Sequence, residues 1–306
     1  MKAIVFKSTG SRYNVKLENG QRADCTLKGT FRLKGIRSTN PIAVGDRVNV
    51  EFTGQEAVIT SIDERDNYII RRSINLSHQS HIIAANIDRA IVLVTLALPK
   101  TTEGFIDRFL CTAGAYHIPA AIVINKIDIY EAQGMKAAKE WKKLYEKIGY
   151  PTLLVSAREK TGLEKLKKLL KNKTTLITGH SGVGKSTLIN AIDEGLEQKT
   201  GVISKAHLKG KHTTTFAEML ELSFGGYIID TPGIKELGLV HIEKSEVAGY
   251  FPEMFALLPK CRYKNCIHIN EPGCAVKEAL ENGEIAESRY LSYLSILNSE
   301  ELRIEY

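Results

Sequence analysis

Residues 179–188 read GHSGVGKSTL and contain the pattern G-x-x-x-x-G-K-S of a phosphate-binding loop. The apolar run TTLIT precedes the loop and the helical pattern KSTLINAI follows it, which is the strand–loop–helix context that the motif requires. Backbone N–H groups at the start of such a helix bind phosphate oxygens. We expect Lys185 to bridge the β- and γ-phosphates and Ser186 to hold Mg²⁺. The predicted contacts with nucleotide are Gly179, His180, Ser181, Gly182, Val183, Gly184, Lys185, Ser186 and Thr187.

Residues 125–128 read NKID and follow the strand-like run AAIVI. In this motif the Asp128 carboxylate can accept both the ring N1–H and the exocyclic amino group of guanine, whereas adenine offers neither donor. A buried Asp128 would be left unpaired by adenine, which predicts a preference for guanine. We expect Asn125 to hold the loop together and Lys126 to cover the base, with Ile127 between them. Because the motif alone is a weak signal, an exposed Asn-Lys turn is the alternative interpretation.

Two further loops follow strand-like runs. Ser156 and Ala157 come after TLLV and can present their backbone to guanine O6. The sequence DTPG begins at Asp230, which can join the water shell of Mg²⁺, and ends at Gly233, whose N–H can contact the γ-phosphate. Four loops at strand ends therefore predict a GTPase. A metabolic kinase would share the phosphate loop but would have no use for NKID and Ser-Ala.

The order of these motifs along the chain is unusual. NKID comes first, followed by Ser-Ala, the phosphate loop, a threonine-rich segment and DTPG. This is the usual GTPase order cut after DTPG and rejoined elsewhere, and such a permutation preserves the site because domain termini often lie close together. The chain leaves the predicted GTPase domain directly after DTPG. We therefore expect the nucleotide state to be coupled mechanically to the C-terminal region.

Four metal-ligating residues lie within fourteen positions near the C-terminus, with the spacing C-x4-C-x-H-x5-C. They are Cys261, Cys266, His268 and Cys274. A set of three thiolates and one imidazole closes a tetrahedral structural zinc site, because it leaves no position open for water. One zinc ion per chain is predicted. Unrelated reduced thiols in a helical domain are the alternative, while Cys25 and Cys111 are expected to be small core residues.

Residues 1–67 contain short alternating runs separated by Gly, Asn and Ser, which predicts a small β-barrel. Four basic residues flank Phe31 in KGTFRLKGIR: Lys28, Arg32, Lys34 and Arg37. Basic residues around an aromatic ring are typical of a nucleic-acid groove. Alternatively, Phe31 and Leu33 are core residues and the lysines form a solvated face. Residues 71–87 carry weak periodic signals and are interpreted as a linker into the next domain.

Residues 68–242 alternate buried strands with amphipathic helices, which predicts an α/β domain with a parallel-type sheet. The expected strands are RAIVLVTL, AAIVINK, TLLVSA and TTLITG, followed by two strands joined at Gly225 and Gly226. The expected helices are GFIDRFLCTAGAYH, AAKEWKKLYEKIG, LEKLKKLLKN and KSTLINAI. Residues 243–306 are predicted to be mostly helical and to contain the zinc site.

Composition limits the remaining classes of protein. The formal net charge is +7 and the isoelectric point is near 9.0, which favours a polyanionic partner only slightly. Five cysteines, with three close together, do not form the framework of a secreted disulfide protein. The longest apolar run, residues 90–98, is too short to span a bilayer. A cytoplasmic, soluble protein without a membrane partner is the expectation.

The permuted motif order, the N-terminal barrel, the segment KHTTT and the C-terminal Cys/His cluster together resemble the bacterial small-ribosomal-subunit-dependent GTPase family RsgA, also called YjeQ or YloQ. The resemblance covers essentially the whole chain. It implies an OB-fold barrel, a circularly permuted GTPase core and a zinc-binding domain that act in late maturation of the 30S subunit. The implied partners are the 30S subunit with its 16S rRNA and GTP or GDP, bound by a monomer.

The residue after the DTPG glycine is Ile234, where Ras-type GTPases have a water-orienting Gln. Isoleucine cannot orient water, so we expect slow turnover alone and dependence on another group. His212 in KHTTT is the internal candidate, because imidazole can position water near neutral pH. Alternatively His212 contacts only phosphate or rRNA, and a ribosomal group is catalytic. One hydroxyl among residues 213–215 should bind Mg²⁺, with Thr214 as the candidate.

Two other functions remain open at this stage. An RNA-binding module could use the GTPase core as a sensor of guanine nucleotide with negligible turnover. A permuted GTPase of the large ribosomal subunit is the other possibility, and the N-terminal barrel argues against it by family analogy only. Turnover measured with and without ribosomal subunits separates the enzyme from the sensor.

Overall fold

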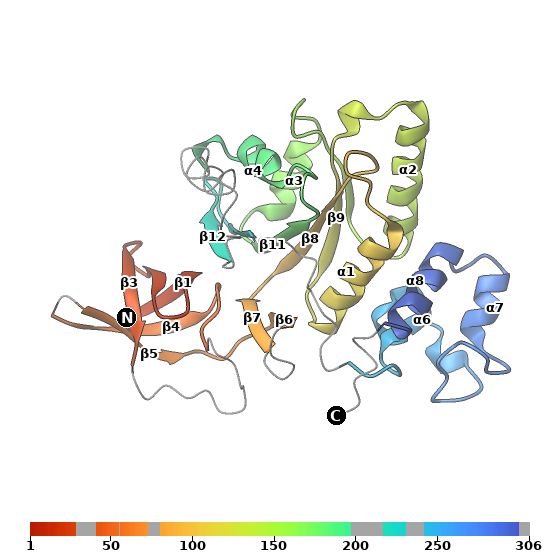
Figure 1. Cartoon of the computed structure of the whole chain (residues 1–306), viewed down its shortest axis with the longest axis horizontal. Coiled ribbons are helices and arrows are strands. Elements are labelled where there is room, and N and C mark those ends of the chain that lie inside the picture. Colours follow the sequence, from red (N-terminus) through yellow and green to blue (C-terminus); the bar gives the residue numbers. More distant parts are fainter. Residues whose placement is uncertain (29–40, 55, 73–79, 197–216, 231–241, 300–306) are drawn as a thin grey trace.

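The computed structural model describes residues 1–28, 41–54, 56–72, 80–196, 217–230 and 242–299. Along the chain it contains a β-barrel, a central α/β domain and a C-terminal group of helices, and the barrel and the C-terminal helices lie on different sides of the central sheet (Figure 1). The boundaries 1–67, 68–242 and 243–306 stay predictions.

Five strands form the barrel: β1 (Lys2–Ser8), β2 (Tyr13–Leu17), β3 (Arg22–Leu27), β4 (Arg47–Thr53) and β5 (Glu56–Ile62). Their order is β1-β2-β3-β5-β4, and β4 also pairs with β1, which closes the barrel. Alternate residues such as Val5, Val15 and Ile59 are buried inside it. The expected OB-fold is thereby confirmed. Phe31 and the basic residues Arg32, Lys34 and Arg37 lie outside the described residues, whereas Lys28 is exposed at the end of β3.

A two-stranded antiparallel hairpin follows the barrel, formed by β6 (Tyr68–Arg72) and β7 (Ser80–Ala85). The interpretation of residues 71–87 as a linker into the next domain is therefore wrong for the part that β6 and β7 occupy. The strands are stabilised by long-range packing: Ile70 and Ile82 contact Ala43 of the barrel region, and Ile69 lies in the core of the central domain. Such contacts leave little trace in a local periodicity.

Six strands form the sheet of the central domain: β8 (Arg89–Val94), β9 (Ala120–Ile124), β10 (Thr152–Leu154), β11 (Thr174–Gly179), β12 (Glu218–Glu221) and β13 (Tyr227–Asp230). Their order is β10-β9-β8-β11-β13-β12, and all pairs are parallel except β12 with β13. The predicted strands are confirmed. Lys7 of β1 pairs with Glu218 of β12, so the barrel and the central sheet are continuous.

In the described part of the domain, four α-helices cover the sheet: α1 (Glu103–Ala115), α2 (Ala132–Lys147), α3 (Leu163–Leu170) and α4 (Lys185–Ile192), with a 3-10 turn η2 (Glu194–Leu196) after α4. Successive strand residues point to opposite faces, so Val92 packs with Phe109 of α1 in one core, and Ile91 packs with Leu188 of α4 in the other. The sheet is thus buried on both sides, as its continuous apolar strands predict.

The C-terminal region is helical in its described part, as expected. It contains η3 (Val247–Tyr250), α6 (Pro252–Phe255), η4 (Leu258–Lys260), α7 (Ala275–Glu281) and α8 (Glu287–Leu297). Its core includes Cys111 of α1, and Cys25 is buried in the barrel core, so both cysteines are core residues as predicted. Burial raises the pKa of the Cys111 thiol to about 12, which keeps it protonated. None of the helices in the described ranges is long and apolar enough to cross a membrane.

Gly45 lies where the barrel meets the hairpin. Its backbone N–H donates to Val5 O at 2.8 Å, and its φ is +91°. A Cβ at this position would lie 2.2 Å from Ala85 O, which no side chain can accommodate without moving the backbone.

Gly45→Ala should therefore lower the free energy of unfolding more than Gly10→Ala. Gly10 has nearly the same φ, +89°, but a Cβ there would meet nothing within 4 Å. The control carries only the cost of a left-handed alanine, about 1–2 kcal/mol, and Gly45→Ala adds the clash. Denaturant unfolding of both variants measures the difference, and equal destabilisation would show that the barrel–hairpin contact contributes nothing.

Candidate nucleotide site and metal centre

The phosphate loop connects β11 to α4, whose N-cap residue Gly184 has a left-handed backbone. A Cβ on Gly184 would lie 2.6 Å from Asn125 Nδ2. Glycine is therefore required for the phosphate loop to approach the NKID loop, residues 125–128, which is called the guanine loop below. The first N–H groups of α4 have no partners within the helix and lie at its positive end. The loop is therefore built to receive an anion.

Asn125 joins three loops through one buried side chain. Its Nδ2 donates to Val183 O of the phosphate loop at 2.9 Å, and its Oδ1 accepts from Ala157 N at 3.2 Å. The side chain is 1% exposed. This arrangement matches the predicted role of Asn125 in holding the loops together.

Lys126 has a left-handed backbone, with φ of +62°. Its Nζ donates to Gly182 O at 2.7 Å and to Leu98 O. The lysine stem therefore runs across the phosphate loop, next to the site where Asp128 would recognise a base.

Asp128 lies in the 3-10 turn η1 (Ile127–Ile129). Its Oδ1 accepts from Ser156 Oγ at 2.5 Å, while Ile127 N donates to Val155 O at 3.2 Å. Ser156 thus orients the carboxylate through its hydroxyl, in addition to the backbone role that the sequence predicts for the 156–157 loop.

Lys185 Nζ lies 3.0 Å from Asp230 Oδ1, so the phosphate-loop lysine and the first residue of DTPG face the same space. This Asp230 oxygen is buried, and within the described part of the chain its contact is the ion pair with Lys185. A carboxylate at this end of the loop fits a hydrated Mg²⁺, which prefers oxygen ligands and keeps several waters. Ser186 is the second residue of α4, directly after Lys185 in sequence, and its side chain is exposed.

The predicted nucleotide residues between positions 125 and 187, together with Asp230, come from the carboxyl ends of β9, β10, β11 and β13. Because these strands are parallel, their ends meet at one edge of the sheet. His212, Thr214, Gly233 and Ile234 lie outside the described residues.

Tyr130 is a site residue that the sequence analysis missed. Its hydroxyl donates to Asn125 O at 2.6 Å and accepts from Leu96 N at 2.8 Å, which ties the guanine loop to the end of β8. Burial raises the pKa of Tyr130, so the hydroxyl stays a donor. A tyrosine two residues after the motif carries no signal by itself, since its partner Leu96 is far away in sequence.

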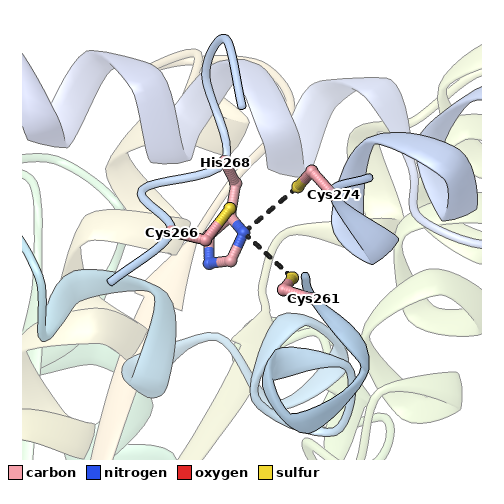
Figure 2. A group of neighbouring side chains, drawn as sticks. All are labelled: Cys261, Cys266, His268 and Cys274. Atoms are coloured by element: carbon pink, nitrogen blue, oxygen red, sulfur yellow. Dashed lines mark hydrogen bonds between the residues drawn. The ribbon is translucent and has the colours of Figure 1, made fainter. Parts of the chain in front are cut away.

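The four predicted metal ligands point toward one another (Figure 2). The ligand atoms of Cys261, Cys266, His268 and Cys274 all lie within 4.8 Å of one another. His268 Nδ1 lies 3.7 Å from Cys261 Sγ and 3.3 Å from Cys274 Sγ. The cluster could therefore hold one metal ion, as predicted.

Burial controls the protonation of the ligand atoms. Burial, followed by the Cys274 sulfur, raises the pKa of Cys266 to about 12, so a thiolate there needs a positive charge beside it. Burial lowers the pKa of His268, which favours the neutral imidazole that binds metal. The chemistry of three sulfurs and one imidazole is that of structural zinc.

Backbone contacts fix the loop that carries these ligands. Tyr290 OH donates to His268 O at 2.6 Å, and Tyr293 OH donates to Ile267 O at 2.7 Å. The Glu271 carboxylate accepts from three backbone N–H groups, including Ile267 N at 2.8 Å. Burial opposes ionisation of Glu271, but these donors outweigh it and lower its pKa. Helix α8 thus orients the metal ligands from outside the cluster.

Comparison with known proteins gives matches over nearly the whole chain. The family model described as RsgA GTPase matches residues 62–240, and the RsgA N-terminal domain model matches residues 2–59. A protein of Bacteroides thetaiotaomicron named small ribosomal subunit biogenesis GTPase RsgA 2 is 54% identical over 98% of this chain and 97% of its own length. A Flavobacterium psychrophilum protein named small ribosomal subunit biogenesis GTPase RsgA is 53% identical over 98% of this chain and 94% of its own length.

Two solved structures have the same fold. YjeQ from Thermotoga maritima superposes with a TM-score of 0.80 and 36% identity, covering 100% of this chain and 99% of that one. YloQ, described as a circularly permuted GTPase, superposes with a TM-score of 0.77 and 28% identity. The match covers 100% of this chain and 96% of the YloQ chain. These matches confirm the permuted arrangement.

Asp128→Asn should weaken GTP binding by on the order of 100-fold, because the amide can accept only one of the two guanine donors, turns its own NH₂ toward the other and lacks the charge, at about 1.5 kcal/mol for each position. Titration with a fluorescent guanine nucleotide, competed by ATP, measures both affinity and discrimination. Ser156→Ala is the matched control: it removes only the hydroxyl that orients Asp128, so a smaller loss with guanine preference retained is expected. Unchanged discrimination of GTP from ATP in Asp128→Asn would contradict the assignment of the guanine loop.

Protein purified without chelator should contain one zinc ion per chain, and Cys261→Ser should contain clearly less. Cys25→Ala removes a buried thiol from the barrel and should leave the zinc content unchanged. Elemental analysis gives the stoichiometry. Structural zinc contributes roughly 10–16 kcal/mol in small metal-dependent folds, so Cys261→Ser should also destabilise the C-terminal helices. Wild-type protein without zinc would contradict the prediction.

Proposed function

The chain belongs to the RsgA GTPase family, and we propose from this that it hydrolyses GTP as a switch in late maturation of the small ribosomal subunit. The observation that carries the proposal is that the carboxyl ends of β9, β10, β11 and β13, which carry the predicted nucleotide residues up to Asp230 of DTPG, lie at one sheet edge, with the motifs in the order of a permuted GTPase. The relatives named for small-subunit biogenesis match both the barrel and the GTPase core, which supports the same role here.

In this proposal the phosphate loop binds the β- and γ-phosphates through backbone N–H groups and Lys185. Asp128, oriented by Ser156, accepts the two guanine donors, and Lys126 covers the base. Asn125 keeps the guanine loop and the phosphate loop at a fixed separation. Base recognition and phosphate binding therefore act on one rigid unit.

Ser186, Thr214 and Asp230 are the residues proposed to hold Mg²⁺ with GTP, Asp230 through its water shell. The ion would neutralise charge on the phosphates as the terminal phosphate departs. The proximity of Asp230 to Lys185 supports this placement, because it brings the first residue of DTPG to the phosphate end of the site. Gly233 is proposed to donate its N–H to the γ-phosphate.

His212 is proposed to position the attacking water, because Ile234 stands where Ras-type enzymes have a glutamine. An imidazole is the side chain best suited to position water or accept its proton near neutral pH. Contacts with the ribosomal subunit are proposed to place the KHTTT segment against the γ-phosphate, which would make turnover slow in the free protein and fast on the subunit.

The barrel and the zinc-binding domain are proposed to bind 16S rRNA in the 30S subunit, with the chain acting as a cytoplasmic monomer. The excess of basic over acidic residues, +7, supports a polyanionic partner. Zinc is proposed as a structural ion that orders the C-terminal loop. Its ligand set leaves no open position for substrate.

Purified 30S subunits should raise the GTP turnover of the full chain by about 10³-fold or more, the range over which activating partners act on other GTPases. His212→Ala should bind GTP and the subunit normally and lose most of this stimulated rate. Phosphate release measured with 30S, with 50S and with neither checks both statements.

His207→Ala is the matched control, because it removes an imidazole five positions before His212 and outside KHTTT, and it should keep the stimulated rate. Full stimulation of His212→Ala would assign the water-positioning group to the ribosome. An unchanged wild-type rate with 30S subunits would overturn the switch and favour a nucleotide sensor that binds RNA.

A further inference from the structure

Helix α1 belongs to two hydrophobic cores at once. Phe109 packs in the core that α1 and α2 form with the central sheet. Cys111, two residues later, packs in the C-terminal core with Phe251 and Tyr293. In Figure 1 the C-terminal helices accordingly lie next to α1. Because close-packed cores transmit displacements, α1 and the C-terminal helices must move together.

One continuous face of α1 contacts the C-terminal helices, and small residues let it approach closely. A Cβ on Gly114 would lie 3.6 Å from Tyr250 Cβ, and one on Gly104 would lie 3.9 Å from Ser292 Oγ. Residues at i, i+3, i+7 and i+10 share one side of a helix. The face consists of Gly104, Asp107, Cys111 and Gly114.

A buried ion cluster lies on this face. Arg289 of α8, 1% exposed, donates through Nη1 to Asp107 Oδ1 at 2.7 Å and through Nε to Glu253 Oε1 at 2.6 Å. Tyr145 of α2 donates to the same Asp107 oxygen at 2.8 Å. The guanidinium carbon also lies 4.4 Å from the centre of the Phe251 ring. Four helices, α1, α2, α6 and α8, are thereby fixed around one cation whose planar fork sets their relative positions.

The first turn of α1 contacts the phosphate loop. The rings of Phe105 and His180 contact each other in a tilted arrangement, with centroids 3.8 Å apart and an interplanar angle of 31°. Thr102 caps the helix by accepting from Phe105 N at 3.3 Å, which fixes the backbone that carries this ring. The segment before α1 also lies close to the loop, since a Cβ added to Gly182 would come 3.6 Å from Pro99 Cδ and Lys126 Nζ donates to both Leu98 O and Gly182 O.

We propose that α1 couples the C-terminal zinc-binding domain to the nucleotide site, with Arg289 and Phe105 as positioning residues. Arg289 holds α1 through Asp107, and Phe105 holds the phosphate loop through His180. The C-terminal domain thus sets how much of the protein has a binding-competent loop, and apparent affinity scales with that fraction. This route is separate from the covalent exit after DTPG. The inference rests on the proposed role of the phosphate loop in binding GTP.

A double-mutant cycle on the full-length, zinc-loaded protein tests the coupling. Arg289→Lys keeps a cation beside Asp107 but cannot span Asp107 and Glu253 as the fork does. Phe105→Ala removes the ring that contacts His180. The dissociation constant for GDP is measured in the wild type, both single variants and the double variant, with the zinc content of each determined.

Arg289→Lys should weaken GDP binding by about fivefold or more when Phe105 is present, the lower end of measured allosteric couplings. In the Phe105→Ala background the same change should cost twofold or less, because the connection is already broken. Tyr145→Phe removes only the 2.8 Å hydrogen bond to Asp107 and enters the same cycle if Arg289→Lys does not fold. Phe105→Tyr should restore the wild-type response.

Tyr290→Phe is the matched control, since it removes a hydrogen bond to His268 O from α8 without touching the ion cluster. Its effect on GDP affinity should be the same in both backgrounds. Equal losses for Arg289→Lys in both backgrounds would mean that the two sites act independently, and would overturn the proposal. A coupling between Tyr290→Phe and Phe105→Ala as large as that between Arg289→Lys and Phe105→Ala would also overturn the proposal. Wild-type protein that fails to bind GDP would instead overturn the proposed function.

Discussion

Asn125 contacts the phosphate loop and the 156–157 loop with the two ends of a single amide. A buried amide left without a partner is costly, so both contacts have to form together. The amide reaches only a few ångströms, which requires the ends of β9, β10 and β11 to lie at one edge and at one level. The parallel register of these strands, with β8 between β9 and β11, supplies that placement.

This constraint also explains why the motif order can change without loss of the site. Asn125 contacts Val183 across 58 positions of sequence. Neither this contact nor the one with Ala157 depends on how the chain connects the loops. The sheet needs only the strands in their spatial order. Cutting the chain after DTPG therefore preserves the geometry at the carboxyl edge of the sheet. It changes only which part of the chain follows DTPG.

Much of the fold followed from local patterns, because each strand of the central sheet is a short continuous apolar run and each motif sits at a strand end. The Cys/His spacing was equally informative, since all four ligands lie within fourteen residues. What sequence could not supply was contact between distant segments. The β6–β7 hairpin is held by packing on the barrel and central domain, and Arg289 meets Asp107 across 182 positions. The burial of Arg289 could not be expected from the sequence, because an arginine in an amphipathic helix is usually exposed.

The two connections between the nucleotide site and the C-terminal domain differ in physical character. The exit after DTPG is covalent and lies outside the described residues, whereas α1 acts through a packed face and a buried ion cluster. A covalent tether restrains distance alone, while a packed face also fixes orientation, because its side chains interdigitate. Removing one partner from a buried ion cluster leaves an uncompensated charge, so intermediate positions of α1 against α8 are unfavourable. The contact therefore favours discrete arrangements over gradual sliding, which is the property that a switch requires of the element joining its two sites.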